Sequence, residues 1–148
     1  MKLRIFVIDD EENIRETFKW HLESLGHEVV ALPDPSYCAA YVGRPCEVED
    51  ACADILIIDY SMPYMDGLSF LELLERNNCL FAAQFIMILT GNANQIDKSV
   101  ADRIGCEIRQ KPMTVLELEE WVNSLAKHIP PDRKLADLAF LNLDNKKP

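Results

Sequence analysis

The sequence predicts a single α/β domain built around a parallel β-sheet. Short aliphatic runs alternate five times with segments whose apolar residues recur at helical spacing. The aliphatic runs, such as residues 55–58, are apolar at consecutive positions, as expected for a sheet covered on both faces. With 148 residues, 49% of them hydrophobic, the chain is long enough to bury a core of its own.

The strands are expected at five short runs rich in aliphatic and β-branched residues. They are residues 3–8, 28–32, 55–58, 84–89 and 107–110, the last being weak by composition. Between and after them, helices are expected over apolar repeats at 14–25, 37–41, 68–74, 96–104 and 115–129.

Local signals support several of these helix boundaries. Gly26 is placed to end the first helix, and Asp34-Pro35 opens the second with an N-cap residue followed by proline. The apolar face of that second helix is weak. Thr114 and Glu117 form a capping box that begins the last helix.

Two segments do not fit the alternation. Residues 43–54 form an acidic loop, in which one helical turn is expected over 48–52. Loops tolerate insertions at little cost in stability. An insertion without a function is therefore favoured over a contact surface that is particular to this protein. Pro130-Pro131 marks a boundary, which predicts a domain over 1–129 and a tail over 130–148. The tail is expected to form a short amphipathic helix and then to be disordered.

Charge and hydropathy exclude several functions. The net charge of -10 argues against direct binding to nucleic acid, which requires clustered Lys and Arg. No apolar run is long enough for a membrane span, and no secretory signal is visible at the start, so a cytoplasmic protein is expected.

The cysteines indicate neither a disulfide framework nor a zinc ribbon. There are five, at positions 38, 46, 52, 79 and 106, and none forms a C-x-x-C pair. Reduced, mostly buried thiols are expected. A disulfide between Cys46 and Cys52, which share a polar loop, is the less favoured alternative.

The candidate chemistry lies at the carboxyl ends of the predicted strands. Asp9 and Asp10 follow the first strand, Asp59 the third, Thr90 the fourth and Lys111 the fifth. In a parallel sheet these ends gather at one edge, where ligands bind in open α/β folds. Each residue alone is commonly a turn former or a cap, and it is their joint placement that predicts a site.

The residue types point to phosphoryl chemistry. Three close carboxylates repel one another unless a cation lies among them, and a hard ion such as Mg²⁺ suits them. Asp59 can act as a nucleophile toward phosphorus. Lys111 can pair with Asp59 or with a phosphoryl oxygen, and Thr90 can donate a hydrogen bond to another. Lys111-Pro112 is a candidate cis peptide bond.

These residues resemble the response-regulator receiver family of two-component signalling. The resemblance rests on Asp9-Asp10-Glu11, on Asp59-x-x-Met62-Pro63-x-Met65-Asp66-Gly67, on Thr90-Gly91 and on Lys111-Pro112. It covers residues 2 to about 128 and implies a flavodoxin-like doubly wound (βα)5 sandwich with strand order 2-1-3-4-5.

The resemblance also implies roles for single residues. Asp59 would accept a phosphoryl group from a histidine kinase or a histidine phosphotransfer protein. Asp10 would bind Mg²⁺ directly, Asp9 largely through water, and the backbone carbonyl of Ser61 would complete the metal site together with Asp59. Thr90 and Lys111 would hold the phosphoryl oxygens. The protein would then be a signalling switch that catalyses only its own phosphorylation and dephosphorylation, with a downstream protein partner and the capacity to form a homodimer.

Two other functions remain open at this point. Family members usually carry Tyr or Phe three residues before the lysine, where this chain has Ile108. This departure is the feature in favour of a receiver-like binding module that works without phosphorylation. A Mg²⁺-dependent phosphohydrolase is disfavoured because Ser61, two residues after Asp59, is a poor general base. No output domain is recognisable after Pro130, so the chain is either a single-domain regulator or a piece of a longer protein.

Overall fold

The computed structural model confirms the predicted parallel sheet. It describes residues 1–148 except 45, 47, 80–82 and 141–148. The five strands are β1 (Arg4–Ile8), β2 (Glu28–Leu32), β3 (Ala53–Asp59), β4 (Ala83–Thr90) and β5 (Glu107–Gln110). Each neighbouring pair is parallel, and the order is β2-β1-β3-β4-β5, as the family resemblance implied.

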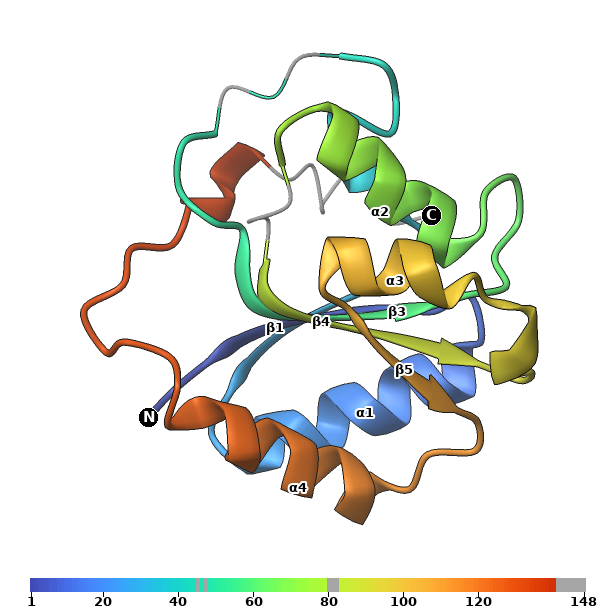
Figure 1. Ribbon diagram of the computed structural model, residues 1–148. Helices are drawn as coiled ribbons and strands as arrows, with labels where there is room; N and C mark the ends of the chain where they lie inside the picture. Colours follow the sequence, from blue (N-terminus) through green and yellow to red (C-terminus); the bar gives the residue numbers. More distant parts are fainter. Residues whose placement is uncertain (45, 47, 80–82, 141–148) are drawn as a thin grey trace.

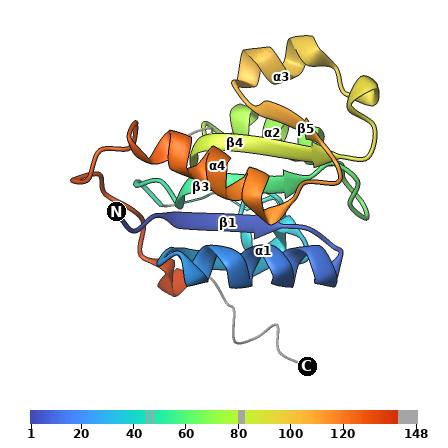
Figure 2. The ribbon, with the colours of Figure 1, turned by 90° about the horizontal axis from the view of Figure 1, so that it is seen from below.

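Four α-helices cover the two faces of the sheet (Figures 1 and 2). They are α1 (Glu12–Ser24), α2 (Gly67–Arg76), α3 (Lys98–Ile104) and α4 (Val115–Ala126). Helices α1 and α4 lie on one face and α2 and α3 on the other. Side chains alternate along β1 accordingly: Ile5 and Val7 belong to the α1/α4 core, whereas Phe6 and Ile8 belong to the α2/α3 core.

Side-chain caps and a glycine mark several helix ends, two of which, at Gly26 and Thr114, were expected from the sequence. The Asp66 carboxylate accepts a hydrogen bond from the Ser69 amide at 2.7 Å and so caps α2. The Thr114 hydroxyl accepts one from the Glu117 amide at 3.1 Å at the start of α4. Gly26 follows α1 with φ +94°, a conformation that glycine adopts without strain.

The predicted second helix is wrong. Residues 35–37 form only a 3₁₀ helix, η1 (Pro35–Tyr37), and Cys38 leaves it in an extended conformation. Asp34 and Pro35 do occupy the predicted cap positions. The segment before Gly43 is short and its apolar face is weak, so its packing cannot offset the free-energy cost of helix nucleation. Tyr37 and Ala40 instead reach the core separately, with the Tyr37 ring 5.3 Å from that of Phe6.

The helical turn expected over residues 48–52 is also wrong. These residues form bends and irregular chain, and Ala51 forms an isolated parallel bridge with Leu135. The bridge joins the acidic loop to the tail, because the Ala136 amide donates to the Ala51 carbonyl at 2.8 Å. A main-chain partner has replaced the local helical hydrogen bonds.

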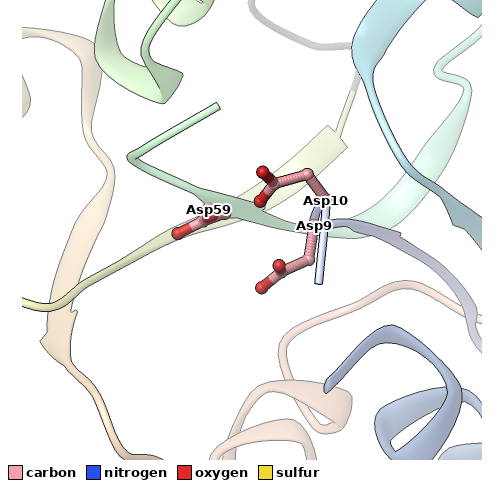
Figure 3. A group of neighbouring side chains, drawn as sticks. All are labelled: Asp9, Asp10 and Asp59. Carbon is pink, nitrogen blue, oxygen red and sulfur yellow. The ribbon is translucent and has the colours of Figure 1, made fainter. Parts of the chain in front are cut away.

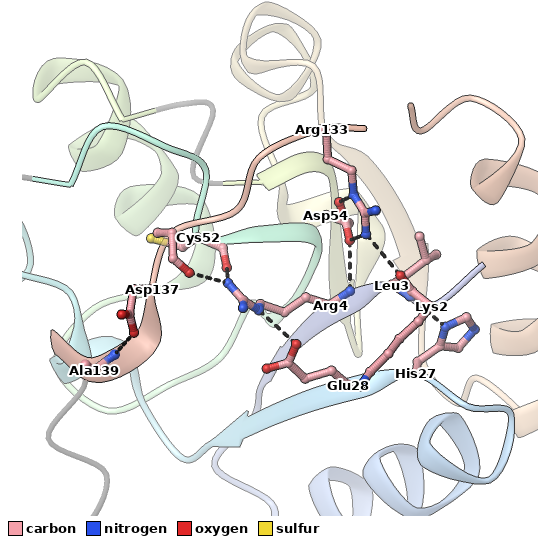
Figure 4. Close-up of polar contacts among 11 residues, drawn as sticks. Lys2, Leu3, Arg4, His27, Glu28, Cys52, Asp54, Arg133, Asp137 and Ala139 are labelled. Carbon is pink, nitrogen blue, oxygen red and sulfur yellow. Dashed lines mark hydrogen bonds and ion pairs between the residues drawn. The ribbon is translucent and has the colours of Figure 1, made fainter. Parts of the chain in front are cut away.

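The described part of the tail packs against the amino end of the sheet (Figure 4). Arg133 makes a bidentate ion pair with Asp54, at 2.8 Å from Nε to Oδ1 and 2.7 Å from Nη2 to Oδ2. Arg4 donates to the Ala136 carbonyl at 2.7 Å. A 3₁₀ helix, η4 (Leu138–Phe140), follows. The division at residue 129 stays a prediction, and the predicted disorder of the end falls on residues 141–148, outside the described part.

The Arg133–Asp54 pair predicts a large stability effect. Asp54 is 1% exposed. Among the described residues, Arg133→Ala leaves this buried carboxylate with the Arg4 amide, 2.8 Å away, as its one hydrogen-bond donor. We expect the free energy of unfolding to fall by about 3 kcal/mol, measured by urea denaturation. Lys134→Ala, which removes an exposed cation from the next position, is the control and changes little. Equal urea midpoints for the two variants would contradict the expectation.

Candidate functional site

The predicted site residues meet at the carboxyl edge of the sheet. Asp59 is the last residue of β3 and Thr90 the last of β4, while Asp9 and Lys111 follow β1 and β5. Main-chain hydrogen bonds continue past the strand ends: the Tyr60 amide donates to Leu89 and the Lys111 amide to Thr90, each at 2.7 Å. The backbone that carries the site is therefore held by the sheet itself.

Three carboxylates form the acidic part of the site (Figure 3). Asp9 and Asp59 are 2% and 3% exposed, whereas Asp10 is exposed to solvent. Oxygens of the three lie within 4.8 Å of one another. Two buried anions and a third at the rim repel one another unless a cation or a proton lies among them.

Lys111 supplies part of the opposing charge. Its Nζ is 3.0 Å from Asp59 Oδ1 and 3.4 Å from Asp9 Oδ2. It also lies 3.4 Å from Glu11 Oε1, an exposed contact that sequence reasoning did not anticipate. Because one ammonium serves several carboxylates, the site keeps a negative excess.

The excess appears in the pKa values of the buried acids. Burial, and then the neighbouring Asp9 charge, raise the pKa of Asp59 from 3.8 to about 6, against the lowering effect of Lys111. Burial also raises the pKa of Asp9. The two carboxylates titrate as a pair, so these directions describe the site more than either residue alone.

The arrangement fits a hard divalent ion. Asp9 Oδ1 accepts a hydrogen bond from the Glu11 amide at 2.8 Å, whereas the buried Oδ2 accepts none from the described residues and has the Lys111 ammonium 3.4 Å away. The three carboxylates offer an all-oxygen set of ligands, which Mg²⁺ prefers. Asp9, Asp10 and Asp59 could hold the ion. Ser61 lies exposed just beyond β3, and the role of its carbonyl stays a prediction.

Thr90 is fully buried and its hydroxyl is already engaged. Its Oγ1 accepts hydrogen bonds from the Asn92 amide at 3.1 Å and from Gln95 Nε2 at 3.3 Å. The loop after β4 therefore shares the hydroxyl that was predicted to reach a phosphoryl oxygen. That predicted role requires Thr90 to exchange these partners.

Sequence reasoning missed two residues that position the site. Gly67 approaches so closely that an added Cβ would lie 2.6 Å from the Asp59 carbonyl oxygen, and its amide donates to Tyr60 at 2.8 Å. The Arg15 guanidinium donates to the Asp9 carbonyl at 2.8 Å. The signal for Gly67 was its place in the motif after Asp59. Nothing in the sequence marked Arg15. The Lys111-Pro112 bond is cis, as predicted.

Fold and site together define a parallel α/β protein with a buried acidic pocket and a lysine at its sheet edge. Residues 5–123 match the response regulator receiver domain family, and the chain belongs to that family. No helix in the described part of the chain has both the length and the apolar character needed to cross a membrane.

Individual relatives agree with this membership. The alkaline phosphatase synthesis transcriptional regulatory protein PhoP of Bacillus subtilis is 25% identical over 86% of this chain. This chain spans only 50% of PhoP. Protein PilG of Pseudomonas aeruginosa is 26% identical over 86% of this chain and 88% of its own length.

Solved structures share the fold. The receiver domain of the Francisella response regulator 1452 has a TM-score of 0.63 at 25% identity and covers 86% of this chain and 98% of its own. The chemotaxis response regulator CheY4 of Vibrio cholerae has a TM-score of 0.65 at 21% identity and covers 84% and 99%.

The raised pKa of Asp59 predicts a pH-dependent stability. A carboxyl group whose pKa is raised from 3.8 to about 6 in the folded state stabilises the fold below about pH 4, and this contribution is lost as the pH rises through about 6. In buffer with a metal chelator, we expect Asp59→Asn to be more stable than wild type at neutral pH by about 2 kcal/mol. The difference vanishes near pH 4. Urea denaturation across this range tests it, and parallel stability curves would contradict it.

The close approach of Gly67 to the Asp59 backbone predicts that a larger residue at position 67 destabilises the fold. Gly67→Ala places a methyl group against the Asp59 carbonyl, so β3 and α2 must separate, and we expect a loss of about 2 kcal/mol in unfolding free energy. The control is Gly91→Ala, where an added Cβ meets nothing within 4 Å. Thermal denaturation of both variants decides the point, and a Gly67→Ala melting temperature no lower than that of Gly91→Ala would refute it.

Proposed function

We propose that the protein is a phosphoacceptor receiver that takes a phosphoryl group onto Asp59 from the phosphohistidine of a kinase or phosphotransfer protein. The observation that carries the proposal is the placement of Asp59. Its carboxylate is nearly buried at a rigid strand end, 3.0 Å from Lys111 and beside two further carboxylates. Membership of the receiver family supports the same function.

The chemistry follows from the charges. With a pKa of about 6, Asp59 is mainly ionised at neutral pH and can attack phosphorus with a carboxylate oxygen. A P–O bond forms as the P–N bond to the donor histidine breaks. Lys111 already lies at the attacking carboxylate and can follow the charge onto the phosphoryl oxygens. When bound, Mg²⁺ neutralises negative charge on the transferring group.

The proposed output is a change in a protein-binding surface. An added phosphoryl group brings negative charge and acceptor oxygens to an edge that is already acidic. The buried Thr90 hydroxyl is a predicted partner of the phosphoryl group, and its present bonds to Asn92 and Gln95 connect it to the loop that leads to α3. Exchange of these bonds would move that loop. The partner, the homodimer and the cytoplasmic location stay predictions.

Ile108 favours a second candidate function. Ile108 lies half-buried in β5 and packs against the α2/α3 core. Because isoleucine has no aromatic ring, this position cannot respond to a movement of Thr90 by turning a ring inward. A binding module that works without phosphorylation would bind its partner equally as wild type, as Asp59→Asn and as phosphorylated protein. A phosphorylation switch would not.

Phosphorylation itself is tested with a small acyl phosphate and Mg²⁺. We expect intact-protein mass spectrometry to show one added phosphoryl group on wild type and none on Asp59→Asn. The control is Asp102→Asn, which makes the same carboxylate-to-amide change at an exposed position on α3 and is expected to be phosphorylated like wild type. The proposal fails if wild type gains no mass or if Asp59→Asn gains as much.

A further inference from the structure

The Thr90 hydroxyl uses its full hydrogen-bonding capacity on the loop that follows β4. A hydroxyl offers one donor and two acceptor sites. Oγ1 donates to the Asn92 carbonyl at 3.3 Å, and it accepts from the Asn92 amide at 3.1 Å and from Gln95 Nε2 at 3.3 Å. Thr90 is 0% exposed, so solvent has no access to these bonds. A phosphoryl oxygen on Asp59 can bind this hydroxyl only by displacing a bond to the loop.

The loop contains one short turn, the 3₁₀ helix η3 (Ala93–Gln95), which Asn92 caps. In Figure 1 it follows the arrowhead of β4 and precedes α3. The bonds within the turn are local. The Gln95 amide donates to the Asn92 carbonyl at 3.2 Å, and the Asn94 amide donates to Asn92 Oδ1 at 3.1 Å. Because a single turn is unstable by itself, the place of η3 depends on its contacts with the strands.

Two glutamine side chains supply hydrogen bonds between η3 and the sheet. Gln95 Nε2 donates to Thr90, the last residue of β4. Gln110 Oε1, at the end of β5, accepts from the Ala93 amide at 3.2 Å. Gln110 is the register partner of Thr90 and directly precedes Lys111. Both glutamines are exposed, so burial does not fix their side chains. Their amides thus connect η3 to both strands that carry the predicted phosphoryl ligands.

Gln110 supplies a connection between β5 and the loop that Ile108 does not. Ile108 lies three residues before Lys111, where the receiver family usually carries an aromatic residue, and it packs against the α2/α3 core. Gln110 lies two positions further along β5, and its side chain reaches Ala93 in the loop. The connection in this chain is therefore made by hydrogen bonds from amide groups.

We propose that Gln95 and Gln110 are positioning residues that hold η3 in its resting place and release it when Asp59 is phosphorylated. The inference rests on the proposed function, because the phosphoryl group supplies the competing acceptor for the Thr90 hydroxyl. As the hydroxyl turns toward a phosphoryl oxygen, it leaves the loop, and Gln95 Nε2 loses its acceptor. With this bond lost, η3 shifts and the bond from Ala93 to Gln110 opens.

Movement of η3 reaches α3 through the two residues that join them. Ile96 is 4% exposed and belongs to the α2/α3 core. Asp97 caps α3, since its Oδ1 accepts from the Ser99 amide at 3.0 Å and from the Val100 amide at 3.4 Å. Because η3, Ile96 and Asp97 are consecutive in the sequence, a shift of η3 changes both the packing of Ile96 and the place where α3 begins. The start of α3 then responds to the state of Thr90.

Beryllium fluoride with Mg²⁺, a mimic of the phosphoryl group on an aspartate, tests the proposal on the full chain. Gln95→Met keeps the length of the side chain and removes the donor. A bond made only in the resting state opposes the other state, so its loss should lower the beryllium fluoride concentration at half-saturation about fivefold in an NMR titration. The control is Gln84→Met, the same change at an exposed position near the other end of β4, which should keep the wild-type value.

A double-mutant cycle separates this role from a general effect on the fold. Thr90→Val removes the hydroxyl and keeps the shape of the side chain. In that background, Gln95→Met should leave the half-saturation concentration unchanged, because Gln95 acts through the hydroxyl. Gln110→Met should speed hydrogen exchange of the Ala93 amide in the free protein, as beryllium fluoride should in wild type.

Three results overturn the proposal while the proposed function stands. Wild type binds beryllium fluoride, but Gln95→Met has the half-saturation concentration of Gln84→Met. Gln95→Met has an equal effect with and without the Thr90 hydroxyl. Beryllium fluoride leaves exchange of the Ala93 amide unchanged in wild type. If wild type neither binds beryllium fluoride nor gains a phosphoryl group, the proposed function itself fails, and the role of the two glutamines fails with it.

Discussion

The site depends on a charge imbalance at the end of β3. Asp59 and Asp9 are buried, and one ammonium group, Lys111, lies within 3.4 Å of both. The sheet holds these groups in place, because main-chain hydrogen bonds continue past the strand ends into Tyr60 and Lys111. Relaxation of the backbone therefore cannot relieve the repulsion. The repulsion is relieved when the site binds a cation or a proton.

Strand β3 carries a second buried carboxylate, Asp54, near its other end, and the charge of this one is neutralised within the chain. Asp54 is as deeply buried as Asp59, yet it receives a bidentate guanidinium from Arg133 and the Arg4 amide. Its charge is satisfied within the chain, so it serves the fold. Asp59 shares a single lysine with its neighbours, so it is available for chemistry. Similar burial thus gives two carboxylates opposite roles, and the difference lies in their donors.

Much of the site could be predicted from the sequence because strand ends are local features. An aliphatic run followed by Asp59 marks the end of a strand, and parallel pairing then brings Thr90 and Lys111 to the same edge. The strand order needed the family resemblance, since periodicity does not specify which strands are neighbours. The roles of Thr90 and Ser61 stay predictions, because they concern a bound phosphoryl group or ion.

The features that sequence reasoning missed depend on distant contacts. Gly67 matters through the backbone of Asp59, and Arg133 meets Asp54 across 79 positions of sequence. The helix expected after Asp34 failed because Tyr37 and Ala40 gain more by packing singly than by completing a weak helical face.

We propose that Lys111 supplies too little positive charge for the carboxylates of Asp9, Asp10 and Asp59, and that a divalent ion supplies the rest. Carbon-13 NMR of the aspartate carboxyl groups across pH measures this directly, with and without Mg²⁺. The account predicts that Asp59 titrates near 6 in the presence of a chelator and that saturating Mg²⁺ lowers its pKa markedly. A pKa for Asp59 that is already at or below 3.8 with the chelator, or one that does not respond to Mg²⁺, would contradict it.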